Sequence, residues 1–352
     1  MTAMYPAELA DLLSQLPRHR LGTLPTPLHP LPRLSAELGG PSIWAKRDDL
    51  TGLAFGGNKI RQLEYFVGAA LAEGADVMIG GGSFAQSNHA RACSAAARAA
   101  GLTPVIVVRP GGPPAAGDDG RPAGNAALTR LLCDDVRLVP ELAQAPTDRL
   151  GEVQARRSVF EGIADEYRAR GHRPYVLPGT SVGLGVIGYV AAVLELQAQF
   201  DAADLRPDWV VVTSIGVTQA GLEVGSRLLG LPWRVAGLAY RPVGGKGNAT
   251  VCRLANEAAG ILGADLVLSA EQVVNFDTMA GPDYGVASAA SDAALRLAAK
   301  TDSVFLDPVY TAKGMATLIS LIRDGFFRAD ETVVFVHTGG LPALFAYPVE
   351  RP

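Results

Sequence analysis

Short apolar segments alternate with longer segments rich in Ala, Leu and Arg along most of the chain. The short segments predict strands at 76–79, 104–108, 136–139, 173–177, 209–213, 235–239 and 332–337. The longer segments predict helices at 60–73, 87–100, 124–132, 150–170, 186–200, 220–229, 249–262, 287–300 and 313–324. The apolar runs are unbroken, which is typical of strands covered on both faces. This rhythm predicts an α/β fold with mostly parallel sheets.

The bulk composition narrows the class of protein. The chain has 352 residues, 48% of them hydrophobic, enough for one large domain or two ordinary ones. A net charge of -4 argues against a nucleic-acid or anionic-membrane partner. No signal peptide and no membrane-length apolar run is recognisable, so we expect a soluble cytoplasmic protein.

Metal and disulfide chemistry have little support in the sequence. The three cysteines are far apart, and Cys93 in its Ala-rich segment is expected to be a small buried hydrophobe. The five histidines show neither HxH nor HExxH spacing, so no metal site is predicted. The Pro/Gly-rich stretch at 110–124 is expected to be a surface loop.

Glycine-rich segments follow several of the predicted strands. They lie at 56–59, 80–83, 179–183, 213–221 and 337–340. In α/β sheets, ligands bind where such loops gather at the carboxyl ends of strands. The 213–221 loop precedes a predicted helix, whose N-terminus favours an anion such as a phosphate. Ser214, Thr218 and Gln219 could add side-chain donors, although an ordinary βα turn would look similar.

Lys59 is one of only five lysines, and it follows two glycines at the start of a predicted helix. The positive partial charge of a helix N-terminus favours a neutral or covalently modified amine there. A neutral amine is the nucleophile needed for a Schiff base, although a solvated surface lysine is the common alternative. A phosphate cradle together with a Schiff-base lysine describes pyridoxal 5′-phosphate.

The sequence resembles a known family at this point. The stretch "KRDDLTGLAFGGNKIRQLEY" at 46–65 resembles the D-cysteine desulfhydrase and 1-aminocyclopropane-1-carboxylate (ACC) deaminase family, of the tryptophan-synthase-β-like, fold type II class. The resemblance continues through "QSNHARACSAAARAAGL", "GNAALTRLL", "LGVIGYV", "GVTQAGLEVG", "LDPVYTAKGM" and "VFVHTGGLPALFAY". It covers about residues 20–347, nearly the whole chain.

The resemblance implies roles for individual residues. Lys59 would form the Schiff base with the cofactor and move the Cα proton, beside Asn58. Asn88 would hydrogen-bond the 3′ oxygen, and Ser87 would bind the substrate carboxylate or help to move protons. The phosphate would be held by residues of one segment, with Ser214 before it: Gly216, Val217, Thr218, Gln219, Ala220 and Gly221.

Other residues implied by the resemblance would face the substrate or the ring nitrogen. Tyr284 and Tyr310 would face the substrate, and Thr311 or Thr338 would lie near the pyridine nitrogen. His89 and Phe84 are further substrate-side candidates. Simpler readings stay open: Asn88 could cap a helix, Tyr310 could be a core residue, and His89 could be structural. His337 is expected to be a packing residue.

The residue after "DPVY" bears on the reaction. ACC deaminases have Glu there, which keeps the ring nitrogen protonated, whereas this chain has Thr311, as D-cysteine desulfhydrases do. The resemblance therefore implies a lyase that catalyses α,β-elimination on D-cysteine or a related β-substituted amino acid. ACC deamination is the alternative. Ser83, Phe84 and the 179–182 turn depart from the family pattern, and with the 110–124 loop they leave the exact substrate open.

Two readings from other classes compete with this one. A dinucleotide-binding protein would need a GxGxxG fingerprint, which is absent. A non-catalytic cofactor or metabolite binder is compatible with the loops but not favoured by the intact Lys59, Ser87, Asn88 and Tyr310. The class also implies a large cofactor-binding domain of residues 1–59 and 176–352, a smaller inserted domain of residues 60–175, and a homodimer.

Overall fold

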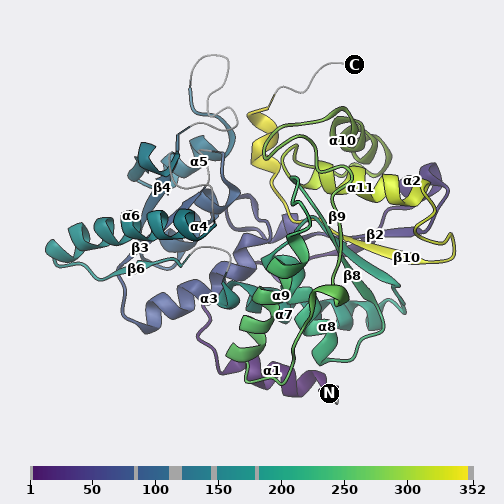
Figure 1. Cartoon of the computed structure of the whole chain (residues 1–352), viewed down its shortest axis with the longest axis horizontal. Helices are drawn as coiled ribbons and strands as arrows, with labels where there is room; N and C mark the ends of the chain where they lie inside the picture. The colour runs from purple at the N-terminus through teal and green to yellow at the C-terminus, as the bar shows by residue number, and fades with distance from the viewer. Residues whose placement is uncertain (1–2, 83–85, 111–120, 144–148, 179–181, 348–352) are drawn as a thin grey trace.

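The computed structural model describes residues 3–82, 86–110, 121–143, 149–178 and 182–347. Within these ranges the strands form two sheets (Figure 1). The larger sheet has the strand order β1-β2-β10-β7-β8-β9. Its strands are β1 (Leu28–Pro30), β2 (Ser42–Lys46), β7 (Trp209–Val212), β8 (Arg234–Leu238), β9 (Val274–Phe276) and β10 (Thr332–Val336).

The pairing of the larger sheet gathers three loops at one edge. All its neighbouring strands are parallel except β1, which lies antiparallel to β2. Val336 of β10 pairs with Lys46 of β2 on one side and with Val212 of β7 on the other. The segments that follow these three residues therefore leave the sheet together, at the carboxyl edge where α/β proteins bind ligands.

The smaller sheet has the order β5-β4-β3-β6 and is parallel throughout. Its strands are β3 (Val77–Gly82), β4 (Thr103–Val108), β5 (Asp135–Leu138) and β6 (Pro174–Val176). Most residues of β3 and β4 are buried, which agrees with their unbroken apolar sequence.

Helices cover both faces of each sheet (Figure 1). On one face of the larger sheet pack α1 (Pro6–Ser14), α7 (Gly183–Ala202), α8 (Val217–Leu228) and α9 (Gly247–Ile261). On the other face pack α2 (Pro32–Leu38), α10 (Ala289–Asp302) and α11 (Thr311–Arg323). The α/β layering predicted from the sequence is confirmed.

The smaller sheet lies between α3 (Lys59–Ala72) and α4 (Asn88–Ala99) on one face and α6 (Arg149–Ala169) on the other. Beside α4 lies α5 (Gly124–Leu132). Short 3₁₀ helices lie at Asp48–Leu50, Leu53–Phe55, Pro140–Ala143, Ala270–Gln272 and Leu341–Phe345. Helix α3, which begins at Lys59, contacts both α4 and α7 and so joins the two sheets.

The predicted strands and helices are all present, with ends that differ by a few residues. The sequence missed α1, α2, β1, β2 and β9. In the sequence, the first strand of the smaller sheet begins at Val77 and the last one ends at Val176. The proposed domain boundaries at 60 and 175 remain a prediction.

One helix in the described residues, α7, is long and apolar enough to cross a membrane. Most of it is buried between α3, α8 and α9, so it is a core helix of a soluble protein.

Candidate functional site

Two glycines shape the turn that precedes Lys59. Gly56 and Gly57 have φ angles of 60° and 110°, a region that favours glycine. A Cβ atom at Gly56 would lie 2.4 Å from the Asp49 carbonyl oxygen, and one at Gly57 would lie 3.1 Å from that of Thr338. Only glycines allow this close approach, and the turn delivers Lys59 as the first residue of α3.

Lys59 lies close to other titratable groups, but the described residues supply no counter-charge to it. Among the described residues, no hydrogen bond or salt bridge reaches its side chain. Burial lowers the pKa of Lys59 to about 8, and only the field of Cys93 opposes the effect. A useful fraction of the amine is therefore neutral near physiological pH, as a nucleophile requires.

The loop after β10 packs directly on the Lys59 turn. The Asn58 backbone N–H donates to the Thr338 carbonyl at 3.0 Å. A Cβ at Gly339 would lie 2.7 Å from the Cα atom of Gly57, so the two glycine pairs touch backbone to backbone. His337 is buried, with one ring nitrogen 2.8 Å from the Phe305 carbonyl oxygen and the other accepting the Gly339 N–H. This matches the packing role expected of His337.

The N-terminus of α8 has the features of an anion site. Gly216 supplies no side-chain cap, and a Cβ there would meet no atom within 4 Å. In the described part of the chain, the backbone N–H groups of Val217, Thr218 and Gln219 have no partner. The Asn58 amide nitrogen donates to the Thr218 hydroxyl at 2.9 Å. That bond ties the anion site to the turn carrying Lys59, as one ligand with a phosphate and an aldehyde would require.

Other predicted members of the phosphate segment lie further from its opening. The Gln219 side chain donates to the Val274 carbonyl of β9 at 3.1 Å. A Cβ at Gly221 would lie 2.3 Å from that of Tyr189, so this glycine is needed for the packing of α8 on α7. Ala220 is fully buried, whereas Ser214, two residues after the end of β7, is half-buried.

The start of α4 carries three predicted residues. Ser87 is its N-cap, and the Ser87 hydroxyl accepts the Ala90 N–H at 3.2 Å. The open alternative that Asn88 caps this helix is therefore wrong, because Asn88 is already its first helical residue. The Asn88 side-chain oxygen accepts a hydrogen bond from the Asn125 amide at 2.9 Å.

His89 lies on the same turn, with a ring nitrogen 3.2 Å from the sulfur of Cys93. Burial lowers its pKa to about 3, and the nearby charge of Lys59 adds to the effect. The imidazole is therefore neutral over the physiological range. Burial also raises the pKa of the Cys93 thiol, in agreement with its expected role as a buried hydrophobe.

Tyr284 and Tyr310 form a pair. Their hydroxyl oxygens are 2.7 Å apart, and the ring of Tyr240 packs against both. Burial raises the pKa of Tyr284 to about 12 and also raises that of Tyr310 well above its ordinary value, so both phenols stay protonated. The pair can therefore donate and accept hydrogen bonds without carrying charge.

Thr311 begins α11, and its hydroxyl is bonded within the chain. It donates to the Asp307 carboxylate at 2.7 Å and accepts the Asp307 backbone N–H at 2.7 Å. A Cβ at Gly340 would lie 2.6 Å from the Asp307 carboxyl carbon, so this group abuts the loop that carries Thr338. The Thr338 loop therefore lies between the start of α11 and the Lys59 turn and contacts both.

Several predictions fall on residues outside the described ranges. They are Ser83 and Phe84, most of the 179–182 turn, and most of the 110–124 loop. In the ranges that are described, no group of His, Cys, Asp and Glu side chains could hold a metal ion.

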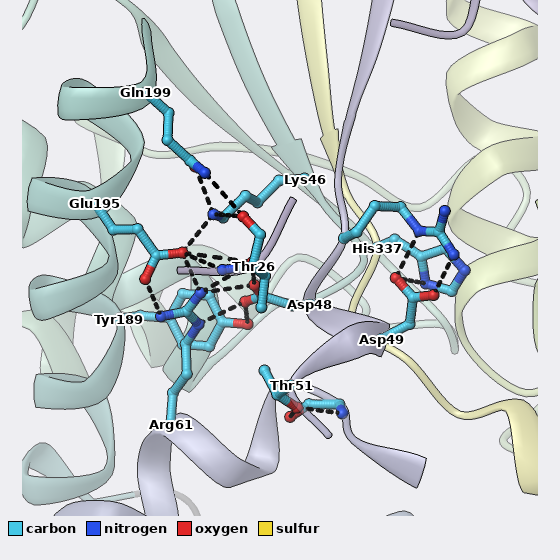
Figure 2. Close-up of polar contacts among 12 residues, drawn as sticks. Thr26, Lys46, Asp48, Asp49, Thr51, Arg61, Tyr189, Glu195, Gln199 and His337 are labelled. Carbon is cyan, nitrogen blue, oxygen red and sulfur yellow. Dashed lines mark hydrogen bonds and ion pairs between the residues drawn. The ribbon is translucent and has the colours of Figure 1, made fainter. Parts of the chain in front are cut away.

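A buried ionic network beside the site was not predicted (Figure 2). The Asp48 carboxylate accepts hydrogen bonds from Arg61 at 2.8 Å and from Tyr189 at 2.5 Å. Arg61 also pairs with Glu195 at 2.8 Å, and Glu195 in turn pairs with Lys46. The network joins the end of β2, the start of α3 and the middle of α7. Its members are far apart in sequence, which is why no local motif revealed it.

Two further polar residues, Arg91 and Asn125, were also missed. Both are buried next to Asn88 and to the turn before Lys59. The one available signal was an arginine within an Ala-rich helix, where an unpaired charge would be costly.

Comparisons with known proteins agree with this geometry. A sequence model of the family described as "Pyridoxal-phosphate dependent enzyme" matches residues 19–339. The chain is 39% identical over 341 residues to a 1-aminocyclopropane-1-carboxylate deaminase of Methylobacterium nodulans, covering 96% of this chain and 98% of that protein. It is also 39% identical over 343 residues to a D-cysteine desulfhydrase of Salmonella schwarzengrund, covering 95% and 97%.

Solved structures give the same result. A crystal structure described as an ACC deaminase homologue superposes with a TM-score of 0.82 at 33% identity, covering 98% of both chains. A fungal L-serine ammonia-lyase from Rhizomucor miehei superposes with a TM-score of 0.57 at 21% identity, covering 90% of this chain and 93% of that one, which shows the shared fold alone. The lowered pKa of the Lys59 amine and the open N-terminus of α8 fit the aldehyde and phosphate of pyridoxal phosphate. The chain belongs to the pyridoxal-phosphate dependent enzymes of fold type II, in the family that includes the ACC deaminases and the D-cysteine desulfhydrases.

Proposed function

We propose that this enzyme catalyses α,β-elimination on D-cysteine or a closely related β-substituted amino acid. The substrate would lose its Cα proton and its β substituent, and water would replace the amino group. D-Cysteine and water would thus give pyruvate, hydrogen sulfide and ammonia. The observation that carries this proposal is the residue at position 311, which is Thr where an ACC deaminase would be expected to have Glu.

Pyridoxal phosphate, when bound, withdraws electrons from the substrate Cα and so makes its proton acidic. In this chain Lys59 would hold the cofactor and would then accept that proton at Nζ. Its lowered pKa suits both tasks, because a base works best with a pKa near the working pH. His89 is a poor general base by the same criterion, since its pKa is about 3.

The phosphate would be held by the N-terminal N–H groups of α8, with Thr218 placed by Asn58. Ser87 would receive the substrate carboxylate together with the first backbone N–H groups of α4, because a helix N-terminus favours an anion. The hydrogen of the Ser87 hydroxyl would be available for this, since in the described part of the chain the hydroxyl only accepts a hydrogen bond, as the N-cap. Tyr284 and Tyr310 would face the substrate side chain as neutral hydroxyl groups.

Thr311 is uncharged where ACC deaminases have Glu, and this difference supports elimination. A carboxylate beside the ring nitrogen would keep that nitrogen protonated and strengthen electron withdrawal. The nearby Asp307 does not replace the missing Glu, because its oxygens already accept the N–H groups of Val309, Tyr310 and Thr311 and the Thr311 hydroxyl. Elimination of a thiol requires less electron withdrawal than opening a cyclopropane ring.

ACC deamination is the second candidate. It is favoured by the names of two relatives of 39% and 38% identity and of the solved homologue. The D-cysteine desulfhydrase relative has the same 39% identity as the first of these. The names therefore do not decide between the two reactions, and Thr311 is the residue that supports elimination.

The test is to incubate the holoenzyme separately with D-cysteine, L-cysteine and ACC, and to measure ammonia, 2-oxo acid and sulfide. We expect pyruvate and sulfide from D-cysteine and little product from ACC. Thr311→Ser keeps the hydroxyl and should retain most of the activity. Thr311→Glu places a second carboxylate beside Asp307 and should reduce the elimination. Faster turnover of ACC than of D-cysteine by the wild type would contradict the proposal.

The proposed domain division places the cofactor where the two sheets meet, at the start of α3. A homodimer and a cytoplasmic location are proposed from the family resemblance. Light scattering of the purified holoenzyme would test the first, since a mass near twice 36.7 kDa is expected.

A further inference from the structure

Arg91 is a buried cation with no carboxylate partner in the described ranges. Its side chain is 1% exposed, and none of the salt bridges among the described residues includes it. Its guanidinium donates instead to the Asn125 side-chain oxygen at 2.8 Å, to the Gly56 carbonyl at 3.2 Å and to the Ala54 carbonyl. Burial lowers its pKa to about 10, so it stays charged at neutral pH. Burying a charged group beside neutral partners costs free energy. A role other than stabilising the fold should therefore account for Arg91.

Two of those partners belong to a strained turn. Residues 54–57 have consecutive φ angles of 45°, 68°, 60° and 110°, and the first two are Ala54 and Phe55 rather than glycines. Non-glycine residues in this region cost of order 1–3 kcal/mol each and persist only where neighbours hold them. Arg91 holds the carbonyls of Ala54 and Gly56, and Thr51 holds the Gly57 N–H at 2.8 Å. The turn ends one residue before Asn58 and two before Lys59.

The third partner, Asn125, transmits the orientation of Arg91 to Asn88. A guanidinium can only donate, so the Asn125 atom that faces it must be the oxygen. The Asn125 amide nitrogen then faces Asn88 and the Gln86 carbonyl, at 2.9 Å and 3.2 Å. The Asn88 atom that meets Asn125 must therefore be its oxygen. The Asn88 NH₂ group is left without a partner among the described residues, so its hydrogens are available to a ligand.

We propose that Arg91 is a positioning residue that fixes, with one guanidinium, both the turn that delivers Lys59 and the direction in which Asn88 presents its NH₂ group. Lys59 is the predicted covalent attachment point of the cofactor, and Asn88 is the predicted donor to its 3′ oxygen. That oxygen is an acceptor, so only the NH₂ end of Asn88 is complementary to it. Arg91 thus couples the two contacts without touching the cofactor. The inference rests on the proposed cofactor contacts of Asn88 and Lys59, and not on the identity of the substrate.

Asn125→Asp separates positioning from stability. The new carboxylate still accepts from Arg91, and more strongly, but it cannot donate to Asn88. The melting temperature should therefore be maintained while the Asn88 amide loses its fixed orientation. We expect the dissociation constant of pyridoxal phosphate, titrated by its visible absorption, to rise about 10-fold or more. Asn256→Asp is the matched control: Asn256 also bonds through both ends, to the backbone of Leu268, but it lies away from the site.

A double mutant distinguishes an effect through Asn88 from the added negative charge. If Asn125 acts through Asn88, then Asn125→Asp should change the dissociation constant little in an Asn88→Ala background. Independent, multiplying effects of the two substitutions would overturn the proposal. So would an unchanged dissociation constant and unchanged visible spectrum for Asn125→Asp alone.

Arg91→Lys tests the other half of the inference. Lysine keeps the charge but cannot reach three acceptors with fixed geometry. Capture of the cofactor by Lys59 should slow, and the pH dependence of that capture should shift, because the turn is no longer held. Unaltered capture kinetics with a wild-type pH profile would overturn this half. These measurements follow cofactor binding, so they can succeed even if D-cysteine proves not to be the substrate, which would contradict the proposed function alone.

Discussion

Lys46 and Lys59 are thirteen residues apart, and both are placed by the same edge of the larger sheet, yet their surroundings differ. Lys46 ends β2, is 1% exposed, and donates to the Thr26 carbonyl, to Glu195 and to Gln199 (Figure 2). Lys59 has none of these partners among the described residues. Burial lowers the pKa of both amines, but Asp48 and Glu195 oppose that effect at Lys46.

The difference distinguishes a structural lysine, Lys46, from Lys59, the one that we propose is reactive. A buried amine that is paired with a carboxylate is held as a cation and contributes to the fold. A buried amine without a counter-charge becomes a nucleophile near neutral pH. The network around Lys46 reaches Arg61, two residues beyond Lys59, so the structural lysine helps to hold the helix that carries the reactive one.

Removing Lys59 should have the largest effect. Lys59→Ala should lower the rate of the proposed elimination by about 10²–10⁴-fold, because it removes the group that we propose moves the Cα proton. The visible absorption band of covalently held cofactor should disappear as well. The free energy of unfolding of the cofactor-free protein should not fall, since the amine that is lost is desolvated and has no partner among the described residues. Substantial destabilisation with a retained band would make Lys59 the structural lysine instead.

Lys46→Met should show the opposite pattern. We expect the free energy of unfolding to fall by about 3 kcal/mol, because Glu195 loses one of its two cationic partners while remaining largely buried. Urea unfolding measures this, with Lys300→Met as a control at an exposed position. The cofactor band should persist in the variant. A lost band in a protein of normal stability would contradict the distinction between the two lysines.

Asp48 should make the network sensitive to acid. Burial is the largest single influence and raises its pKa, but the charge and hydrogen bonds of Arg61, with the charge of Lys46 and the Tyr189 hydrogen bond, together outweigh burial. The pKa therefore falls from 3.8 to about 2. A lowered carboxyl pKa contributes stability that is fully present above about pH 4 and is lost as the pH falls towards 2. That contribution is about 2 kcal/mol by the size of the shift. Unfolding free energies measured from pH 5 to pH 2 should show this loss in the wild type and not in Asp48→Asn.

The pH dependence of cofactor capture should show the smallest effect. Because only the neutral amine of Lys59 attacks, capture by the cofactor-free enzyme should slow about tenfold for each pH unit below about 8 and should level off above it. Stopped-flow absorbance measures the rate. A midpoint near the ordinary lysine value of 10.5 would mean that burial does not activate Lys59.

The sequence predicted the scaffold well where local chemistry decides the structure. Unbroken apolar runs such as β7 and β4 were recognised because both faces of these strands are buried. By contrast β2 was missed, since it ends in Lys46, and a charged residue normally indicates the surface. Strands β1 and β9 have only three residues each, too few to show a period.

The candidate site also contains residues that local sequence patterns predict and residues that they do not. Lys59, the α8 N-terminus and Ser87 could be predicted as site residues because glycine turns and helix starts are local patterns. The groups that support them depend on long-range contacts. Asp48 and Glu195 share Arg61 although they are far apart in sequence, and Arg91 reaches Asn125 on another helix. No local pattern predicts such pairs, so the supporting layer became visible only in the structure.

The most direct test of this account is to find which lysine holds the cofactor. The holoenzyme would be treated with borohydride, which fixes the cofactor to its lysine permanently, and the modified peptide would be identified by mass spectrometry. We predict the pyridoxyl group on Lys59, with Lys46 unmodified in the same sample. A pyridoxyl group on Lys46 or on any other lysine, or none at all in a protein that binds the cofactor, would contradict the account.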